Sequence, residues 1–373
     1  MKSISVLIKP VSSLCNLRCR YCFYGNVSDL REVKSYGIMQ EDTIKNIVNN
    51  TFEILDNGDI VTFAFQGGEP TLAGLRFFQY FIEYVSKIKK NITVNYSIQT
   101  NGTLIDNQWC EFLKKNNFLV GLSLDLLEDL HDKNRVYSDN KGSYIDVIST
   151  KGLMETHKIN FNILCVLTKQ IALNPKEVFN FIKLNNVKYI QFIPCLDDLD
   201  FKTKSEYSLE PKYFAYFYKI IFKLWKNEFN KGNYISINLF DNLISVLITG
   251  IPSTCGIIGK CQPQFVIEAD GSVYPCDFYV LDNFNLGNIK DNTLLDILRK
   301  SKMQEFLHKD INKESICLKC NFYKICGGGC KRMKNSMYID SSNNYCGYKE
   351  FLMSTFGDLE KISVLVYKNQ IPK

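Results

Sequence analysis

Hydrophobic and polar positions follow two different periods along the N-terminal half of the chain. Short runs of β-branched and aromatic residues, bounded by turn formers, predict strands at residues 4–8, 60–65, 94–99, 119–124, 160–167 and 188–193. Between them, apolar residues recur at helical spacing, which predicts helices at residues 41–55, 75–88, 107–115, 144–155 and 175–184. Strand and helix therefore alternate along this half of the chain.

This alternation predicts an α/β fold in which right-handed crossovers connect parallel strands. Six such units would form a partial (β/α)6 TIM-like barrel over residues 1–210. An aromatic-rich amphipathic helix at 213–230 lies in a linking segment at 211–252, and a cysteine-rich domain with a C-terminal helix follows at 253–373. With 373 residues, 46% of them hydrophobic, the chain can bury a large core.

Composition and charge exclude several classes of function. The net charge is +6 and the lysines are scattered, whereas nucleic-acid binding requires a denser basic patch. No apolar stretch reaches transmembrane length, and the N-terminus lacks the core of a signal peptide. We therefore expect a cytoplasmic protein without nucleic-acid or membrane partners. In a reducing compartment, fourteen cysteines indicate metal sites or catalysis rather than disulfides.

A loop of closely spaced cysteines follows the first predicted strand. Cys15, Cys19 and Cys22 could each bind one iron of a four-iron cluster, which leaves the fourth iron open. An open iron on a reducible cluster can bind a small ligand and pass it an electron. The alternatives are a partial zinc site or three ordinary buried thiols. Structural zinc prefers four ligands, and no fourth ligand lies nearby in the sequence.

Polar motifs stand at the ends of the next three predicted strands, where such barrels place their chemistry. They are Gln-Gly-Gly-Glu-Pro at 66–70, Gln-Thr-Asn-Gly at 99–102 and Ser-Leu-Asp at 123–125. Each motif alone is typical of a plain turn. Together with the cysteine loop, they predict a common site at one end of the sheet.

The C-terminal region contains eight further cysteines that could form two four-thiolate sites. Their spacing is Cys255, Cys261-x9-Gly271-x4-Cys276, Cys317-x2-Cys320-x5-Cys326-x3-Cys330 and Cys346. One or two structural zinc ions are the alternative, because Cys-x2-Cys is also a zinc knuckle. Three consecutive glycines at 327–329 suit a tight backbone wrap around a cluster. Of the remaining cysteines, Cys110 and Cys165 are expected in the core, and Cys195 at the edge of the active site.

These motifs resemble those of a known family. The cysteine loop is similar to the Cys-x3-Cys-x-aromatic-Cys signature of radical S-adenosylmethionine (SAM) enzymes, and the C-terminal spacing is similar to their SPASM cluster-binding extension. From residue 4 to about residue 346, the chain resembles the anaerobic sulfatase-maturating enzymes. The residues that carry this resemblance are 7–10, 15–24, 65–74, 99–104 and 270–279.

The resemblance implies three 4Fe-4S clusters and a SAM site. The loop cluster would use Cys15, Cys19 and Cys22; the first auxiliary cluster Cys255, Cys261, Cys276 and Cys330; and the second Cys317, Cys320, Cys326 and Cys346. The residues expected to bind SAM are Tyr21, Gly67, Gly68, Glu69, Gln99, Asn101, Ser123 and Arg135. For Arg135, an exposed arginine in a surface loop is the alternative.

The chain departs from the family at one motif. The family usually has Gly-Pro after Ser-x-Asp, whereas Leu126 and Leu127 follow Asp125 here. We therefore expect a different backbone turn at this point.

The implied reaction is the oxidation of a cysteine or serine in a sulfatase peptide to Cα-formylglycine. A 5′-deoxyadenosyl radical would remove hydrogen from Cβ, Asp277 would act as the base, and an auxiliary cluster would accept the second electron. Tyr24 and Gln66 would line the peptide pocket. The acidic run at 197–200 is a candidate to dock the arginine of a Cys-x-Pro-x-Arg target.

The expected partners are a peptide or unfolded sulfatase and a flavodoxin- or ferredoxin-type electron donor, and the chain is expected to be a monomer in an anaerobic host. Two other functions remain open at this point. One is a SPASM maturase that forms thioether or carbon–carbon links in ribosomal peptides. The other is a non-catalytic iron-sulfur electron carrier or a zinc-binding module.

Overall fold

The computed structural model describes residues 2–88, 90–200, 204–308 and 315–368. The chain forms two compact units, each built from separate segments. The first unit comprises Met1–Ser123, Asp132–Phe161 and Pro263–Leu307, and the second comprises Leu124–His131, Asn162–Gln262 and His308–Lys373. The domain limits expected after residues 210 and 252 stay predictions.

The first unit contains a mostly parallel sheet. Its strands are β1 (Ser3–Ile8), β2 (Ile60–Phe65), β3 (Thr93–Thr100), β4 (Leu119–Ser123), β8 (Phe265–Ile267) and β9 (Val273–Tyr274). Their order is β4-β3-β2-β1-β8-β9; β1 to β4 and β8 pair in parallel, and β8 pairs with β9 in antiparallel orientation. The four predicted strands of this unit are confirmed. The pairing of β8 with β1 was not predicted, because a three-residue strand has too few positions to show a period.

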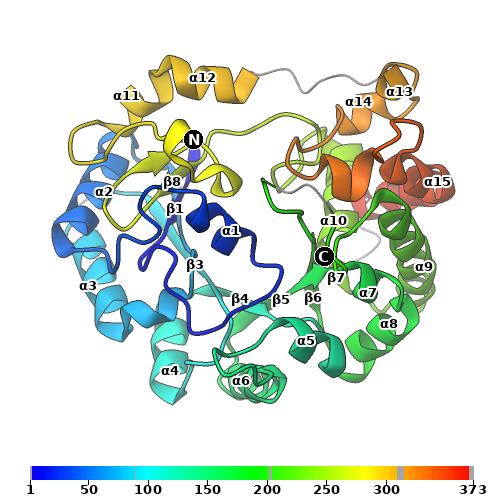
Figure 1. Ribbon diagram of the computed structural model, residues 1–373, viewed down its shortest axis with the longest axis horizontal. Helices are drawn as coiled ribbons and strands as arrows, with labels where there is room; N and C mark the ends of the chain where they lie inside the picture. The colour runs from blue at the N-terminus through cyan, green and yellow to red at the C-terminus, as the bar shows by residue number, and fades with distance from the viewer. Residues whose placement is uncertain (1, 89, 201–203, 309–314, 369–373) are drawn as a thin grey trace. The chain divides into compact units, whose positions relative to one another are not determined.

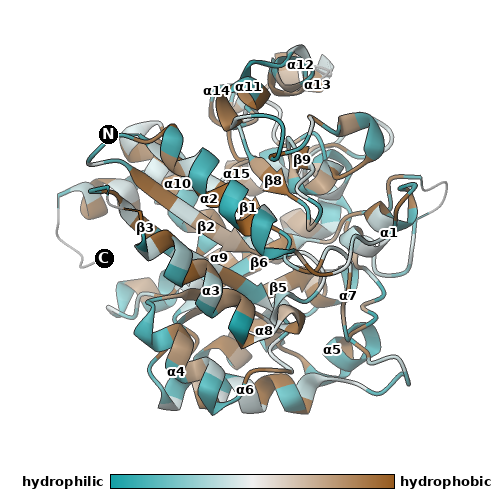
Figure 2. Cartoon of the chain, turned by 90° about the vertical axis from the view of Figure 1, so that its left-hand side faces the viewer, coloured by the Kyte–Doolittle hydropathy of each residue, from teal (hydrophilic) through white to brown (hydrophobic). Residues whose placement is uncertain are grey.

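Helices cover one face of this sheet (Figure 1). The helices and helical turns of the first unit are α1 (Phe23–Asp29), α2 (Glu41–Glu53), η1 (Pro70–Ala73), α3 (Leu75–Ser86), α4 (Asn107–Lys115), α6 (Tyr144–Thr156), η2 (Asp277–Tyr279), η3 (Asp282–Phe284) and α11 (Leu294–Arg299). Figure 2 shows hydrophobic strands and hydrophilic residues on the outer sides of α2 and α3. In α3, Phe77, Phe78, Phe81 and Val85 form the buried face. Asp106 caps α4, because its side chain accepts the N–H of Trp109 at 2.9 Å.

The second unit combines a short parallel sheet with long helices. Its strands, in the order β7-β6-β5, are β5 (Asn160–Leu167, of which residues 160–161 belong to the first unit), β6 (Tyr189–Pro194) and β7 (Ser236–Ile237). Its helices are α7 (Lys169–Ala172), α8 (Pro175–Leu184), α9 (Pro211–Asn230), α10 (Asn238–Thr249), α13 (Ser315–Leu318), α14 (Tyr323–Cys326), the π-helix η4 (Lys334–Tyr338) and α15 (Gly347–Tyr367). Two helices, α5 (Glu128–Asn134) and α12 (Ser301–His308), contain residues of both units.

Aromatic packing holds the long helices of the second unit together. Trp225 of α9 lies with its ring centroid 5.1 Å from that of Phe240 in α10. Phe240 in turn stacks on Phe351 of α15 at 6.2 Å. All three side chains are fully buried. The predicted aromatic-rich helix is therefore confirmed as α9, and its aromatic residues serve packing.

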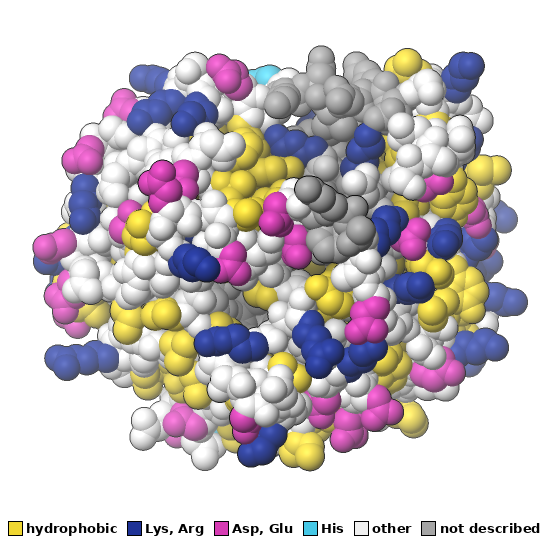
Figure 3. Space-filling view, viewed as in Figure 1, with side chains coloured by type: hydrophobic (Ala, Val, Ile, Leu, Met, Phe, Trp, Pro, Cys, Tyr) yellow, Lys and Arg dark blue, Asp and Glu magenta, His cyan; other side chains and the backbone are white. Residues whose placement is uncertain are grey.

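The surface carries both signs of charge. On the face seen in Figure 3, lysine and arginine side chains are interspersed with aspartate and glutamate side chains. Among the described residues, no helix combines the length and the apolar character needed to span a bilayer.

The turn after β4 contains a leucine in the left-handed region. Leu126 has a φ of 63° and is fully buried. The turn is held to β5, because Leu124 donates to the carbonyl of Leu164 at 3.0 Å and the Asp125 carboxylate accepts the N–H of Val166 at 2.9 Å. Glycine, the usual family residue at this position, adopts such a φ without steric cost. The expected difference between this turn and that of the family stays a prediction.

We expect Leu126→Ala to destabilise the protein more than Leu126→Gly. Both changes remove a buried side chain, which costs about 2–5 kcal/mol. Only alanine retains the steric penalty of the left-handed region, about 1–2 kcal/mol, and this outweighs the lower chain entropy of unfolded alanine. The expected difference is about 1 kcal/mol in favour of glycine, measured by urea or thermal unfolding.

Leu243 is the matched control, because it is buried within α10 of the same unit. There, alanine should be more stable than glycine by about 1 kcal/mol, as in any helix interior. If the alanine variant were more stable than the glycine variant at both positions, the backbone at Leu126 would not be strained.

Candidate functional site

The three cysteines of the N-terminal loop lie between β1 and α1. Cys22 is the N-cap of α1, and its sulfur accepts the N–H of Gly25 at 3.3 Å. The sulfur of Cys15 accepts the N–H of Leu17 at 3.4 Å. Burial raises the pKa of Cys15 to about 11, so its thiolate needs a cation such as iron beside it. The loop is fastened by backbone bonds from Arg18 and Arg20 to the carbonyls of Val136 and Asn134.

The Gly-Gly-Glu-Pro loop packs directly on the cysteine loop. The N–H of Gly68 donates to the carbonyl of Ser12 at 2.9 Å, and the N–H of Glu69 donates to that of Leu14 at 2.8 Å. A Cβ on Gly68 would lie 1.9 Å from the carbonyl oxygen of Leu14. Glycine is therefore required at 68 by the cysteine loop itself, a reason that the sequence did not reveal. Gly67 has a φ of 140°, which favours glycine on conformational grounds.

Glu69 joins two of the predicted motifs. Its buried carboxylate accepts hydrogen bonds from the N–H and hydroxyl of Thr71, the hydroxyl of Thr100 and the N–H of Asn101, at 2.7–3.1 Å. Burial raises the pKa of Glu69, and these four hydrogen bonds oppose the rise. The side-chain amide of Asn101 donates to Asn16 of the cysteine loop at 2.9 Å. Glu69 thus fixes the shape of the loop, and its role toward SAM stays a prediction.

The remaining residues expected to bind SAM lie in the same unit. The Arg135 guanidinium carbon is 5.5 Å from the centroid of the Tyr21 ring, and both side chains are buried. The alternative of an exposed surface arginine is therefore wrong. Ser123 ends β4 and is buried, and Gln99 is half-buried on β3. Their roles toward SAM stay predictions.

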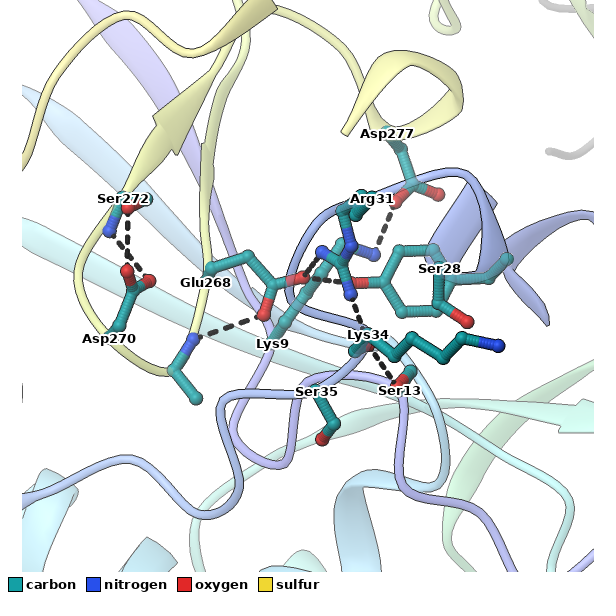
Figure 4. Close-up of polar contacts among 12 residues, drawn as sticks. Lys9, Ser13, Ser28, Arg31, Lys34, Ser35, Glu268, Asp270, Ser272 and Asp277 are labelled. Atoms are coloured by element: carbon teal, nitrogen blue, oxygen red, sulfur yellow. Dashed lines mark hydrogen bonds and ion pairs between the residues drawn. The ribbon is translucent and has the colours of Figure 1, made fainter. Parts of the chain in front are cut away.

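Asp277, the predicted base, is held by two side chains. Gln66 donates to one carboxylate oxygen at 3.0 Å. The Lys9 ammonium contacts the other oxygen at 2.5 Å (Figure 4). The same ammonium lies 3.7 Å from the centroid of the Tyr24 ring. The structure thus brings together Asp277, Gln66 and Tyr24, which sequence reasoning placed in one pocket.

Sequence reasoning missed three charged residues of this site: Lys9, Arg31 and Glu268. The Tyr24 hydroxyl donates to Glu268, and Arg31 contacts the same carboxylate oxygen at 2.7 Å. The side chains of Arg31 and Glu268 are fully buried, and burial raises the pKa of Tyr24 well above its usual value. In the sequence, a charged residue next to an apolar strand could have indicated two of these three residues. Lys9 directly follows β1, and Glu268 directly follows β8.

In the second unit, four cysteines line one pocket. They are Cys317, Cys320, Cys326 and Cys346, the predicted ligands of the second auxiliary cluster. Cys346 is the N-cap of α15, and its sulfur accepts the N–H of Lys349 at 3.4 Å. Burial raises the pKa of Cys326 to about 11, and the other three thiols add to the rise because they are close. Exchange of protons for iron would remove this penalty, so the pocket fits a cluster.

The backbone around this pocket is wound tightly by glycine. Gly327, Gly328 and Gly329 all have positive φ values, of 54°, 91° and 74°. A Cβ on Gly329 would lie 2.0 Å from the Tyr338 ring. The expected tight wrap is confirmed. Among the described residues, no three His, Cys, Asp or Glu side chains are grouped so as to hold a single metal ion.

The predicted ligands of the first auxiliary cluster belong to both units. Cys255, Cys261 and Cys330 lie in the second unit, where charges on Cys255 and Cys261 contribute to raising the pKa of Cys330, although burial is the main cause. Cys276 lies in the first unit, one residue before Asp277. This ligand set stays a prediction.

Three cysteines outside the predicted clusters are buried. Cys110 and Cys165 belong to the core, as expected. Cys195 is buried as well, and its carbonyl accepts the hydroxyl of Ser336 at 2.8 Å. Burial raises the thiol pKa of Cys195, which keeps this thiol protonated. Its expected place at the edge of the active site stays a prediction.

The acidic run lies in the second unit. The Asp197 side chain accepts the hydroxyl of Ser208, and the carbonyl of Asp197 accepts the guanidinium of Arg332. Asp198 is half-buried, and burial, then the charge of Asp200, raises its pKa. Asp197 is thus already engaged, and the docking of a peptide arginine by this run stays a prediction.

Comparison with known proteins identifies two conserved modules. Residues 10–150 match the radical SAM superfamily. Residues 259–321 match SPASM, described as an iron-sulfur cluster-binding domain. These ranges contain the cysteine loop, the Gly-Gly-Glu-Pro loop and several of the C-terminal cysteines.

Individual relatives match over nearly the whole chain. A cysteine-type anaerobic sulfatase-maturating enzyme from Clostridium novyi (strain NT) is 41% identical over 374 residues, covering 99% of this chain and 100% of that protein. One from Clostridium perfringens (strain 13 / Type A) is 44% identical over 369 residues, covering 97% and 99%. A solved structure of native anSMEcpe with bound AdoMet and Kp18Cys peptide superposes with a TM-score of 0.89 at 42% identity, covering 97% and 99%.

We expect Gly68→Ala to lose the cluster of the N-terminal loop. The added Cβ would collide with the Leu14 carbonyl, so the cysteine loop must move away from the Gly-Gly-Glu-Pro loop. After anaerobic reconstitution, the variant should hold less iron and sulfide than the unmodified protein. The difference should equal the iron and sulfide content of one cluster. Gly152→Ala is the control, because nothing lies within 4 Å of its Cβ position in α6. Equal iron content in Gly68→Ala would refute this requirement for glycine.

Proposed function

Because the chain belongs to the anaerobic sulfatase-maturating enzymes of the radical SAM superfamily, we propose that it oxidises the cysteine of a sulfatase peptide with Asp277 as the base. The enzyme performs the family reaction, which converts cysteine or serine to formylglycine. We propose in addition that the target residue is cysteine, that Asp277 is the base and that the enzyme holds three clusters. Both Clostridium relatives are described as cysteine-type, which supports cysteine as the target. Family membership sets aside the ribosomal-peptide maturase, the electron carrier and the zinc module.

The observation that carries the proposal is the arrangement around Asp277. Its side chain is only 17% exposed. One carboxylate oxygen accepts from Lys9 and the other from Gln66. A carboxylate offers about four acceptor positions, so it can still accept the proton of a substrate thiol. The Tyr24 ring lies beside the Lys9 ammonium and would form one wall of the peptide pocket. This arrangement provides a positioned base next to an aromatic surface.

The cofactors proposed are SAM and three 4Fe-4S clusters, held by the cysteines assigned above. When bound, they supply the 5′-deoxyadenosyl radical that removes hydrogen from Cβ and a route for the second electron of the oxidation. In the protein itself, Glu69 holds the Gly-Gly-Glu-Pro loop in shape, and Asp277 accepts the proton of the substrate thiol. The peptide would be a sulfatase segment, as supported by the peptide bound in the solved relative. A flavodoxin- or ferredoxin-type protein is the proposed electron donor.

The test uses the reconstituted, reduced protein with SAM and either a Cys-x-Pro-x-Arg or a Ser-x-Pro-x-Arg peptide. We expect the cysteine peptide to become an aldehyde, which mass spectrometry detects directly, after water has replaced the sulfur and released it as sulfide. SAM should yield methionine and 5′-deoxyadenosine. The serine peptide should react more slowly, because its hydroxyl is a far weaker acid than a thiol. Preference for serine would overturn the cysteine assignment. Deoxyadenosine without any aldehyde would exclude both targets.

We expect Asp277→Asn to lower the rate of aldehyde formation about a hundredfold or more, since an amide cannot accept the substrate proton. Its SAM cleavage should persist, because the described side-chain contacts of Asp277 are with Lys9 and Gln66 and not with residues 67–70 themselves. Asp56→Asn is the control, since Asp56 is 79% exposed. An Asp277→Asn variant that forms aldehyde at the unmodified rate would remove Asp277 from the role of base.

A further inference from the structure

Lys9 is a buried lysine between the proposed base and the aromatic wall of the peptide pocket. It follows β1, and its side chain is only 1% exposed. Its ammonium contacts the Asp277 carboxylate at 2.5 Å and lies 3.7 Å from the centroid of the Tyr24 ring. Burial of an ammonium group is costly unless such partners compensate for lost water. Asp277 and the Tyr24 ring are therefore the partners that compensate for the burial of this charge.

The surroundings of Lys9 hold it in one place. Its β and γ carbons lie 3.3 Å from the position of a Cβ on Gly67, so its stem packs on the Gly-Gly-Glu-Pro loop. On the other side, the Tyr24 ring is fixed by its hydroxyl bond to Glu268. Glu268 is paired with Arg31, which also donates to a backbone carbonyl at residue 34 at 2.7 Å. Figure 4 shows the contacts of Arg31 with Glu268 and with the backbone carbonyl at residue 34.

Asp277 depends on side chains from other parts of the chain for its orientation. It begins the short 3-10 helix η2, and no hydrogen bond from its own turn to its carboxylate is among the described contacts. Lys9 and Gln66 come from the ends of β1 and β2, which are parallel neighbours in the sheet. The sheet thus sets the separation of the two donors, and they set the direction of the carboxylate.

We propose that Lys9 is a positioning residue that orients Asp277 toward the substrate thiol and holds it in register with Tyr24. This inference rests on the proposed function, because it assumes that Asp277 is the base. Lys9 acts after SAM cleavage, by aligning the proton acceptor with the side chain from which hydrogen is removed. A misplacement of about 1 Å at such a group can reduce a rate about a hundredfold.

The first test is Lys9→Met, which keeps an unbranched stem on Gly67 but removes the ammonium. We expect aldehyde formation to fall roughly ten- to a hundredfold, with the KM for SAM unchanged. The ratio of 5′-deoxyadenosine to aldehyde should rise, because SAM is cleaved without productive oxidation. Lys9→Arg, which keeps the charge, should restore part of the loss. Lys2→Met is the control, since Lys2 forms an exposed ion pair with Asp56.

A double-variant cycle separates positioning from a structural role. If Lys9 acts through Asp277, Lys9→Met should cause no further loss of aldehyde formation in an Asp277→Asn background. This background also removes the charge that Lys9 compensates, so the double variant remains informative if Lys9→Met alone folds poorly. Additive losses, or a Lys9→Met variant with the unmodified deoxyadenosine-to-aldehyde ratio, would overturn the inference. Absence of aldehyde from the unmodified protein would instead refute the proposed function.

Discussion

The close packing of the Gly-Gly-Glu-Pro loop on the cysteine loop is the contact on which the rest of the site depends. The backbones of Gly68 and Leu14 approach so closely that no side chain fits between them. This contact places the ends of β1 and β2 against each other, and Glu69 extends it to the end of β3 through Thr100 and Asn101. Three successive strand ends are thereby locked together by the protein's own hydrogen bonds. A site that holds a reactive radical needs such rigidity, because small displacements cost large factors in rate.

Buried charge is the second organising feature of the first unit. Arg31 and Glu268 are fully buried, and Lys9 nearly so, in a region lined by apolar strands. Buried ion pairs contribute little net stability, because desolvation offsets their attraction. Their value here is geometric, since each charge finds its partner in only one arrangement. The network fixes the Tyr24 ring and the Asp277 carboxylate relative to the sheet, and the pairing of β8 with β1 brings Glu268 to Tyr24.

In the second unit, cysteines double as structural residues. Cys346 caps α15, as Cys22 caps α1 in the first unit. Hydrogen bonds from helix N-termini to thiolate sulfur stabilise negative charge, and such bonds tune the reduction potential of a cluster. Binding of iron would therefore also complete the start of each helix.

The sequence by itself determined the strands and helices of the α/β core and the motifs at the strand ends, because these signals are local or periodic. The cysteine ligands are a prediction that rests on spacing and family resemblance. The sequence also placed Asp277, Gln66 and Tyr24 in one pocket through family resemblance. It did not reveal β8, which is too short to show a period, nor the roles of Lys9, Arg31 and Glu268. A single charged residue beside a strand has no local signature of its partner, which lies more than two hundred residues away for Lys9 and Asp277. Only the tertiary structure decided these pairs, because the register of β1 with β2 and β8 brings them within reach.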